Sequence, residues 1–329
     1  MSFRISPLWW PLLGVTSPIT LPLMFARYGR FKKNGELATR LNQERMDRAK
    51  PLELPELDHI ELSVVVEEKT EPGFVGDAGV SYLFKTDMGS LLFDVGFGPE
   101  RPAMGHNSKK MGIDMKDADS LAISHLHPDH MGGMRATRAK KVLLPKELGD
   151  PAGKTCYLPG DAGADGFVCE KIDSPSMLSG GIASTGPLAR SFFFMGLTEE
   201  QALVAKIKGK GLVVFTGCGH PTIEVIMKMV ERLSDEKVYA IGGGLHFPIT
   251  AGRGNIAGVH VQRIFATGKP PWKKLTDLDL DATIAALNKY EPQKVFLSGH
   301  DSCDHALEKM SKELNAQTEV LKAGATYRL

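Results

Sequence analysis

Several side chains able to bind metal ions lie close together in the segment AISHLHPDHMGGM. His125, His127, Asp129 and His130 form the pattern H-x-H-x-D-H directly after the apolar run 121–124, which we expect to be a strand. Because side chains alternate along an extended segment, His125 and His127 lie on the same side and can reach one cation. Imidazole and carboxylate ligands suit zinc, and also iron or manganese. We therefore predict a metal site in this segment.

Further ligands are expected where later strands end. Asp129 and His130 begin a turn or helix, from which they can present a carboxylate and an imidazole to a second cation. His220 in FTGCGH and His300 in FLSGHD each follow an apolar run and a glycine, which lets the backbone pass close to a metal. We predict both as ligands. His246 in GGGLHF is presented similarly, and could bind metal, contact substrate or only cap a strand.

Charge and cysteine content narrow the classes of protein. The chain has 40 Lys+Arg against 39 Asp+Glu, a formal charge of +1, so it lacks the basic excess typical of nucleic-acid binding. Its 4 cysteines are widely spaced, which fits a reducing, cytoplasmic compartment better than a disulfide framework. Cys218 lies between two glycines, and we interpret it as a small packing residue because nothing in the sequence supplies it a base.

The elements that must position these residues alternate between strands and helices, so we predict a mixed α/β fold. The Pro-punctuated segment 51–57 separates an N-terminal arm, residues 1–57, from a catalytic domain, residues 58–329. Strands are expected at 60–68, 80–85, 90–94, 121–124, 201–208, 211–215, 238–241 and 295–297. Helices are expected at 101–111, 220–233, 281–288 and 303–314.

The arm begins with the uncharged run ISPLWWPLLGVTSPITLPLMFA, residues 5–26. As a helix, about 22 residues could cross ~30 Å of hydrocarbon. Four prolines argue against a straight spanning helix, because each removes a backbone donor. They are Pro7, Pro11, Pro18 and Pro22. Trp9 and Trp10 suit the membrane–water boundary.

A basic cluster follows this apolar run. Arg27, Arg30, Lys32 and Lys33 form the flank expected of a segment on the cytoplasmic side of a membrane. We therefore expect residues 5–33 to meet a membrane surface. A cleavable signal peptide is disfavoured, since its charges would precede the apolar run. The alternative is an arm that packs on the protein's own surface or on a second subunit of a homo-oligomer.

The motifs resemble those of the metallo-β-lactamase superfamily. LLFDVGFG, SHLHPDH and TGCGH are similar to its first three motifs. Their order, with IGGGLHF and SGHDSCDHAL, resembles the dihydropterin–ribofuranosylaminobenzene phosphate synthase-like branch over residues 58–329. The resemblance implies a four-layer αββα sandwich, here preceded by the apolar arm. It also implies a metal centre at one edge of the sheets, often with two ions such as zinc.

The resemblance also implies roles for single residues. It places His125, His127 and His220 on one cation, and Asp129, His130 and His300 on the other. Asp94, in LLFDVGFG, would be a carboxylate that orients the histidine loop. Two departures stand out. The branch's His-Cys-Thr-Gly ending is replaced here by HDSC, and YAIGGGLHF has no clear equivalent of the bridging Asp of many superfamily hydrolases.

The chemistry that follows is hydrolysis of a small-molecule substrate. A bound divalent ion lowers the pKa of water to about 7, and the resulting hydroxide can attack an ester, lactone or phosphodiester. Asp129 would orient this nucleophile and move its proton. The apolar arm favours an amphiphilic substrate. We expect the Gly-rich segment 134–190 to shape the pocket.

Three alternatives remain open at this point. One is a pterin-type synthase that forms a C–N bond with loss of diphosphate. Arg253, Arg263 and Lys269 could bind its anionic phosphate. Another is a mononuclear iron oxygenase of the same fold. The last is a binding module without catalysis.

Overall fold

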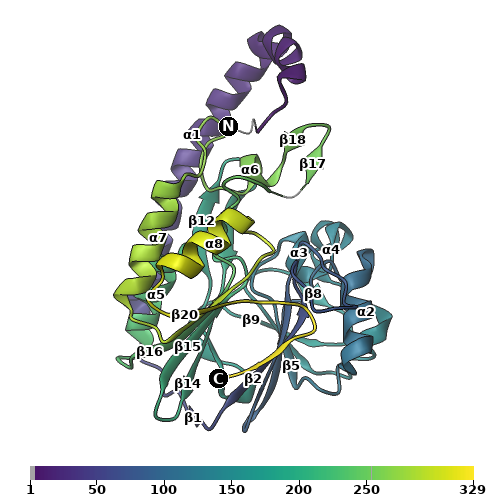
Figure 1. Ribbon diagram of the computed structural model, residues 1–329, viewed down its shortest axis with the longest axis vertical. Coiled ribbons are helices and arrows are strands. Elements are labelled where there is room, and N and C mark those ends of the chain that lie inside the picture. Colours follow the sequence, from purple (N-terminus) through teal and green to yellow (C-terminus); the bar gives the residue numbers. More distant parts are fainter. Residues whose placement is uncertain (1–3, 253) are drawn as a thin grey trace.

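Two facing β-sheets with helices on both outer sides make up the body of the molecule (Figure 1). The computed structural model describes residues 4–252 and 254–329. In order, the first sheet contains β21 (Thr326–Arg328), β2 (Ile60–Val66), β3 (Ser81–Thr86), β4 (Gly89–Phe93), β5 (Ser120–Ala122), β7 (Thr155–Leu158) and β9 (Val168–Lys171). In order, the second contains β10 (Ser176–Met177), β11 (Ala183–Ser184), β14 (Leu203–Ile207), β15 (Gly211–Thr216), β16 (Val238–Gly243), β19 (Lys294–Leu297) and β20 (Gln317–Val320), and β1 (Glu56–Leu57) pairs with β14.

The remaining elements are helices and short strand pairs. The α-helices are α1 (Trp10–Arg48), α2 (Pro102–Met111), α3 (Pro128–Met131), α4 (Met134–Ala139), α5 (Ile223–Leu233), α6 (Gln262–Phe265), α7 (Asp277–Lys289) and α8 (Asp304–Glu313). The strand pairs are β12 (Leu188–Phe192) with β13 (Gly196–Glu200), β17 (Asn255–Ile256) with β18 (Val259–His260), and β6 (Lys141–Val142) with β8 (Gly163–Ala164). Short 3-10 turns are η1 (Pro7–Trp9), η2 (Gly98–Glu100), η3 (Lys146–Leu148) and η4 (Ser179–Gly181).

The buried apolar side chains divide into three clusters, which fill the three spaces between four layers. Along β15, Val213 and Phe215 belong to the cluster between the sheets, whereas Leu212 and Val214 belong to the cluster under α5, α7 and α8. A third cluster packs α2 and α4 against the first sheet. A strand buried on both faces reads as a continuous apolar run, which explains GLVVFT. The predicted four-layer αββα sandwich is confirmed.

Two of the displaced element boundaries lie at the site described below. The predicted strand 201–208 begins only at Leu203, and the predicted helix 220–233 begins only at Ile223. Before Leu203, the Gln201 N–H donates to the Ser124 carbonyl, and before Ile223, the His220 N–H donates to Glu200 of β13. The segment 134–190, for which we predicted no elements, contains strands β7 and β9 and the start of the β12–β13 hairpin.

The four prolines argued against a straight spanning helix, yet α1 is one continuous helix of 39 residues. Pro11 lies in its first turn, where the missing N–H has no partner to lose. Pro18 leaves the carbonyl of Gly14 without its usual donor, and the Ser17 hydroxyl donates to that carbonyl at 2.7 Å. The prolines are therefore accommodated inside the helix.

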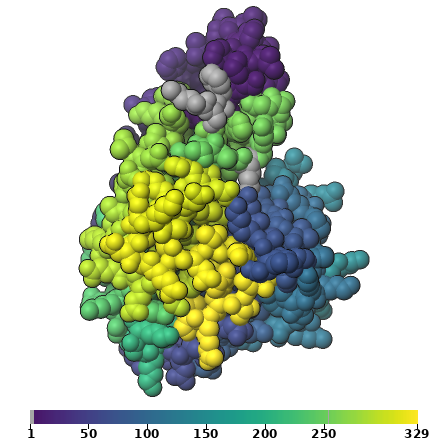
Figure 2. Space-filling view, viewed as in Figure 1, coloured from purple at the N-terminus to yellow at the C-terminus, as the bar shows by residue number. Residues whose placement is uncertain are grey.

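The two halves of α1 lie in different surroundings. The C-terminal half packs on the β12–β13 hairpin, where the buried Asn42 side chain exchanges two hydrogen bonds with the Ala189 backbone, at 2.7 and 2.8 Å. The N-terminal half protrudes from the body, as the purple end of the molecule in Figure 2 shows. By length and composition it could cross a membrane: its most apolar 18-residue window has a mean hydropathy of 1.3, and none of that window is buried. The arm–domain boundary at residue 57 stays a prediction.

Candidate metal centre

The predicted site residues gather where strands of both sheets end. His125 and His127 follow β5, and α3 carries Asp129 and His130. His220, His246 and His300 follow β15, β16 and β19 respectively. These three strands are parallel neighbours, so their carboxyl ends lie at one edge of the second sheet. Residues far apart in sequence are thereby brought to one place, as is common for sites in α/β folds.

The first cluster consists of His125, His127 and His220, with one ring nitrogen of each within 4.8 Å of the others. His220 Nε2 and His127 Nδ1 are 3.1 Å apart. Among the described residues, none forms a hydrogen bond with His125 Nε2 or His220 Nδ1, although both atoms are buried. Buried polar atoms normally have partners, so these nitrogens fit the role of metal ligands.

The protonation states of these three histidines also suit metal binding. Burial is the main cause that lowers the pKa of His127 to about 3, and it lowers the pKa values of His125 and His220 well below the usual value. All three imidazoles are therefore neutral at neutral pH, which is the form that binds a metal.

The second cluster consists of Asp129, His130, Cys218 and His300. The Sγ atom of Cys218 lies 3.0 Å from His130 Nε2 and 3.1 Å from His300 Nε2. Asp129 Oδ2 is 3.6 Å from His130 Nε2. The structure thus brings the three predicted residues together around a thiol that we had interpreted as a packing residue. A signal for it existed, because Cys218 is in the same Gly-rich turn as His220.

Asp94 holds the histidine loop through several hydrogen bonds. Its Oδ1 accepts from the Ser124 N–H at 2.7 Å, and its Oδ2 accepts from the Ser124 hydroxyl at 2.7 Å. His130 Nδ1 is also 2.7 Å from Oδ2. Burial opposes protonation of His130, but Asp94 and Asp129 outweigh it and raise its pKa to about 9. The Asp94 carboxylate thus connects Ser124 and His130 in one buried network.

Glu200 and Gln201 support the site and were missed by the sequence analysis. The Glu200 carboxylate accepts from four consecutive backbone N–H groups, those of residues 217–220, at 2.7–3.1 Å. Gln201 donates through its N–H to the Ser124 carbonyl and through Nε2 to the Ile123 carbonyl, at 2.9 and 2.8 Å. Burial raises the pKa of Glu200 to about 7. The end of β13 thus fixes both ligand loops.

His300 is oriented by a separate buried carboxylate. Its Nδ1 lies 2.6 Å from the Ser298 hydroxyl, which in turn donates to Glu67. Glu67 also accepts from the Tyr82 hydroxyl at 2.8 Å and from the Gly299 N–H at 3.2 Å. Because Glu67 lies in the apolar strand run 60–68, its sequence context gave no sign of this role.

His246 lies beside the first cluster, with its ring centroid 5.0 Å from that of His220. Its backbone φ is +64°, and its Nδ1 is 3.4 Å from Asp301 Oδ2. Within the described chain, neither ring nitrogen of His246 has a hydrogen-bond partner. With Cys218 and His220 it forms a third group of potential ligand atoms. The prediction that it contacts metal or substrate stays a prediction.

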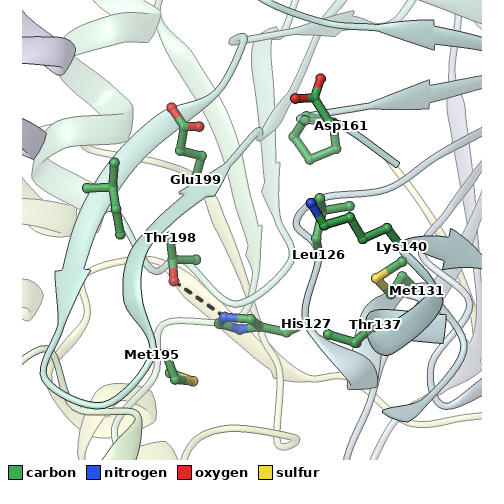
Figure 3. Close-up of a pocket in the computed structure, with 12 residues that line it drawn as sticks. Leu126, His127, Met131, Thr137, Lys140, Asp161, Met195, Thr198 and Glu199 are labelled. Atoms are coloured by element: carbon green, nitrogen blue, oxygen red, sulfur yellow. Dashed lines mark hydrogen bonds between the residues drawn. The ribbon is translucent and has the colours of Figure 1, made fainter. Parts of the chain in front are cut away.

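Two cavities adjoin the clusters. The larger, about 410 Å³, has His127 in its wall together with Met195 and Thr198 of the β12–β13 hairpin region (Figure 3). Thr198 Oγ1 lies 3.4 Å from His127 Nε2, the contact drawn as a dashed line in Figure 3. Part of the segment 134–190 also lines this cavity, as expected, through Thr137, Lys140, Pro159, Gly160 and Asp161. The smaller, about 200 Å³, adjoins His220 and His246.

Comparisons with known proteins agree with this geometry. Residues 75–142, which include the H-x-H-x-D-H segment, match the family model of the metallo-beta-lactamase superfamily. The 7,8-dihydropterin-6-methyl-4-(beta-D-ribofuranosyl)-aminobenzene-5'-phosphate synthase of Methanocaldococcus jannaschii is 23% identical over 240 residues, covering 59% of this chain and 80% of the relative. The crystal structure of a metal-dependent hydrolase of the beta-lactamase superfamily has a TM-score of 0.58 at 22% identity, covering 82% of this chain and 98% of that one.

Fold, site and relatives together define an enzyme of the metal-dependent hydrolase type. The chain has the metallo-beta-lactamase fold, and its residues 75–142 match the model of that superfamily.

Proposed function

We propose that the protein hydrolyses an ester, lactone or phosphodiester, and that it does so with two divalent ions. The observation that carries this proposal is the convergence of two ligand clusters at one edge of the sheets, with His127 of the first cluster in the wall of a cavity. His125, His127 and His220 would hold one ion, and Asp129, His130, Cys218 and His300 would hold the other. Imidazole together with a thiolate favours zinc or iron over magnesium or calcium. Manganese suits the carboxylate but not the thiolate, so zinc is the first candidate.

The roles of the protein groups follow from their positions. The two clusters would hold divalent ions, which would supply a hydroxide nucleophile from water at neutral pH and polarise the bond under attack. Asp129 belongs to the second cluster and its side chain is partly exposed, so it can also take up the proton of the attacking water. Asp94, Glu67 and Glu200 keep the ligand side chains and loops in place without contacting substrate.

The substrate would lie in the 410 Å³ cavity against His127. Its wall offers the apolar side chains of Leu126, Met195 and Leu197 as well as the charged ends of Lys140 and Asp161. A compound with an apolar portion and a polar hydrolysable group would match this lining. The cavity is large enough for a small molecule, since ligand pockets typically measure about 300–1,000 Å³.

The test combines metal analysis with a panel of ester, lactone and phosphodiester substrates. His127→Ala should lower the metal content and reduce hydrolysis at least a hundredfold, because it removes a ligand from the first cluster. His106→Ala is the matched control, since His106 is exposed and distant from both clusters. Full metal content and unchanged hydrolysis in His127→Ala would overturn the proposal, as would a wild-type protein inactive on every substrate of the panel.

The synthase from Methanocaldococcus jannaschii supports a second candidate, a transferase acting on a pterin. Its phosphate-bearing substrate would need cationic groups near the site. Lys269 lines the smaller cavity but is paired with Asp279 at 2.6 Å, and Arg263 donates to the Ile249 carbonyl at 2.6 Å. Arg253, the third predicted cation, lies outside the described residues. Product formation that requires a pterin diphosphate would favour this candidate over hydrolysis.

A further inference from the structure

The protruding half of α1 exposes apolar side chains that a soluble helix would bury. Val15 is 80%, Ile19 71% and Phe25 69% exposed. Between residues 8 and 26, only Thr16, Ser17, Thr20 and Met24 are partly rather than fully exposed. A surface helix of a soluble protein instead buries its apolar face and exposes its polar face. An apolar surface of this kind marks an interaction site.

The hydroxyl groups of this segment are satisfied inside the helix. Thr16 Oγ1 donates to the Leu12 carbonyl at 2.8 Å, and Ser17 Oγ donates to the Gly14 carbonyl at 2.7 Å. Hydrocarbon tolerates polar groups only when they are paired internally, so this arrangement suits a lipid environment. A protein–protein interface usually has a polar rim, whereas residues 8–26 contain no charged side chain.

Both ends of the apolar segment are attached to the body. Near its start, the Arg4 guanidinium donates to the carbonyls of Lys273 and Pro271, at 2.9 and 2.7 Å, and the Ser6 N–H donates to the Gly258 carbonyl at 2.8 Å. At its end, the Arg27 guanidinium donates to the Phe193 carbonyl at 2.9 Å. A helix that crossed a bilayer would place these two ends on opposite sides. The attachments keep them on one side.

The attachment at Arg27 also connects the apolar segment to the cavity. Arg27 contacts the carbonyls of Phe193 and Phe194 in the turn of the β12–β13 hairpin. The next residue, Met195, is 40% exposed and lines the cavity that contains His127. Aromatic rings gather at this point: Phe194 stacks on Phe265 with centroids 4.2 Å apart, and the half-exposed Trp272 is 5.5 Å from Phe193. Such rings are favoured at membrane–water boundaries.

Basic side chains follow the apolar segment along α1. Arg30, Lys32 and Lys33 directly follow the apolar segment and are exposed. Basic side chains beside an apolar helix attract the anionic headgroups of a cytoplasmic leaflet. Apolar insertion combined with this charge gives the two attractive contributions that stable anchoring of a peripheral protein requires.

We propose that residues 8–26 form a one-sided anchor, which enters and leaves a lipid bilayer on the face where the catalytic domain lies. The anchor brings the hairpin turn 193–195 to the bilayer surface, so the cavity at His127 opens there. The substrate is then an amphiphile taken from the leaflet. This last step rests on the proposed hydrolase function, whereas the anchor itself does not.

The anchor is tested with the full chain and vesicles of phosphatidylcholine with phosphatidylglycerol. The double variant Val15→Asp/Ile19→Asp should bind at least tenfold more weakly than wild type in co-sedimentation, because charged side chains resist burial in hydrocarbon. Val168→Asp/Leu278→Asp is the matched control, since those residues are 61% and 79% exposed on β9 and α7. The control should bind as wild type does. The proposal is overturned if the wild-type protein stays in solution, whether or not it self-associates through this surface. It is also overturned if both double variants bind equally well.

Sidedness is tested by labelling with a membrane-impermeant maleimide. Cys169 is exposed whereas the other cysteines are buried, so Ser6→Cys is made in a Cys169→Ser background. The protein is added to preformed vesicles. A one-sided anchor leaves residue 6 outside the vesicle with the body, and labelling should match that in detergent. Protection until detergent is added would mean that the helix spans the bilayer, which overturns the one-sided geometry.

The substrate step is tested with two esters that share a leaving group. On soluble p-nitrophenyl butyrate, Val15→Asp/Ile19→Asp should equal wild type, because the site is untouched. On p-nitrophenyl palmitate in vesicles, it should lose at least tenfold in rate. Equal rates on the palmitate ester overturn the amphiphile step. If neither ester is cleaved by wild type, the hydrolase proposal loses its support, while co-sedimentation still decides the anchor.

Discussion

At the scale of single residues, Cys218 changes the expected ligand set most. Its thiol lies between two imidazoles that we predicted as ligands of the second ion. Sequence reasoning identified the histidines by their spacing, but a single cysteine between glycines carries no such pattern. Proximity to His130 and His300 depends on three segments meeting at the sheet edge. The fold brings these three segments together, and the sequence of any one segment does not predict it.

Cys218→Ser should lower the metal content from two ions to one per chain. A hydroxyl is a far weaker ligand than a thiolate for zinc or iron, while the three-histidine cluster is unchanged. Elemental analysis after dialysis against a defined zinc concentration measures the content. Cys303→Ser is the control, because Cys303 is also buried but lies outside the ligand clusters. Two ions retained in Cys218→Ser would show that the thiol is not a ligand.

Metal affinity should depend on pH differently at the two clusters. His127, with a pKa of about 3, is already neutral above that pH, so the first cluster should bind almost equally well from pH 6 to 8. His130, with a pKa raised to about 9, must lose a proton to bind. The metal affinity of the second cluster should therefore rise about tenfold for each pH unit as the pH increases toward 9. Burial raises the pKa of the Cys218 thiol as well, which steepens this rise.

Competition titrations with a chromophoric chelator at pH 6, 7 and 8 measure both affinities. Calorimetry in buffers of different ionisation enthalpy counts the protons released. One weakly and one steeply pH-dependent site are expected. Two sites of equal slope would contradict the assignment of the raised pKa to His130.

At the scale of elements, the β12–β13 hairpin connects the N-terminal helix to the site. Asn42 of α1 holds the Ala189 backbone of β12, and Glu200 at the end of β13 holds the loop of His220. The sequence predicted most elements that carry ligands, because buried strands read as apolar runs. It did not predict this hairpin, since LARSF and GLTEE lack the alternation of a half-buried sheet strand. Contacts with α1, over a hundred residues away, stabilise it instead.

Asn42→Ala should destabilise the protein by about 1–3 kcal/mol for each of the two Ala189 backbone groups left unpaired. Denaturation in urea measures the change in the free energy of unfolding. Gln43→Ala is the neighbouring control, because Gln43 is exposed and only reaches Asp47 on the same helix. It should cost about 0.5 kcal/mol or less. Equal costs for the two variants would mean that α1 does not support the hairpin.

At the scale of the whole molecule, metal binding should stabilise the fold. The clusters join ends of strands from both sheets, so ions held there link the two halves of the sandwich. A ligand at 100 times its dissociation constant stabilises the native state by about 2.7 kcal/mol per site. Treatment with EDTA should therefore lower the melting temperature by several degrees.

Adding zinc should restore the melting temperature of the chelated protein, whereas magnesium should not, because magnesium prefers oxygen ligands. Scanning calorimetry of the treated and reloaded protein measures both. A melting temperature indifferent to EDTA would indicate that the clusters hold no ion that contributes to stability.

The four backbone N–H groups bound by Glu200 have a consequence for the apo protein. The turn that carries Cys218 and His220 is shaped by the internal carboxyl group of Glu200, so an incoming ion does not have to gather it. The ordering entropy is lost when the chain folds, not when the metal arrives. The site is thereby preorganised, and metal exchange can proceed without unfolding and refolding of the ligand loops.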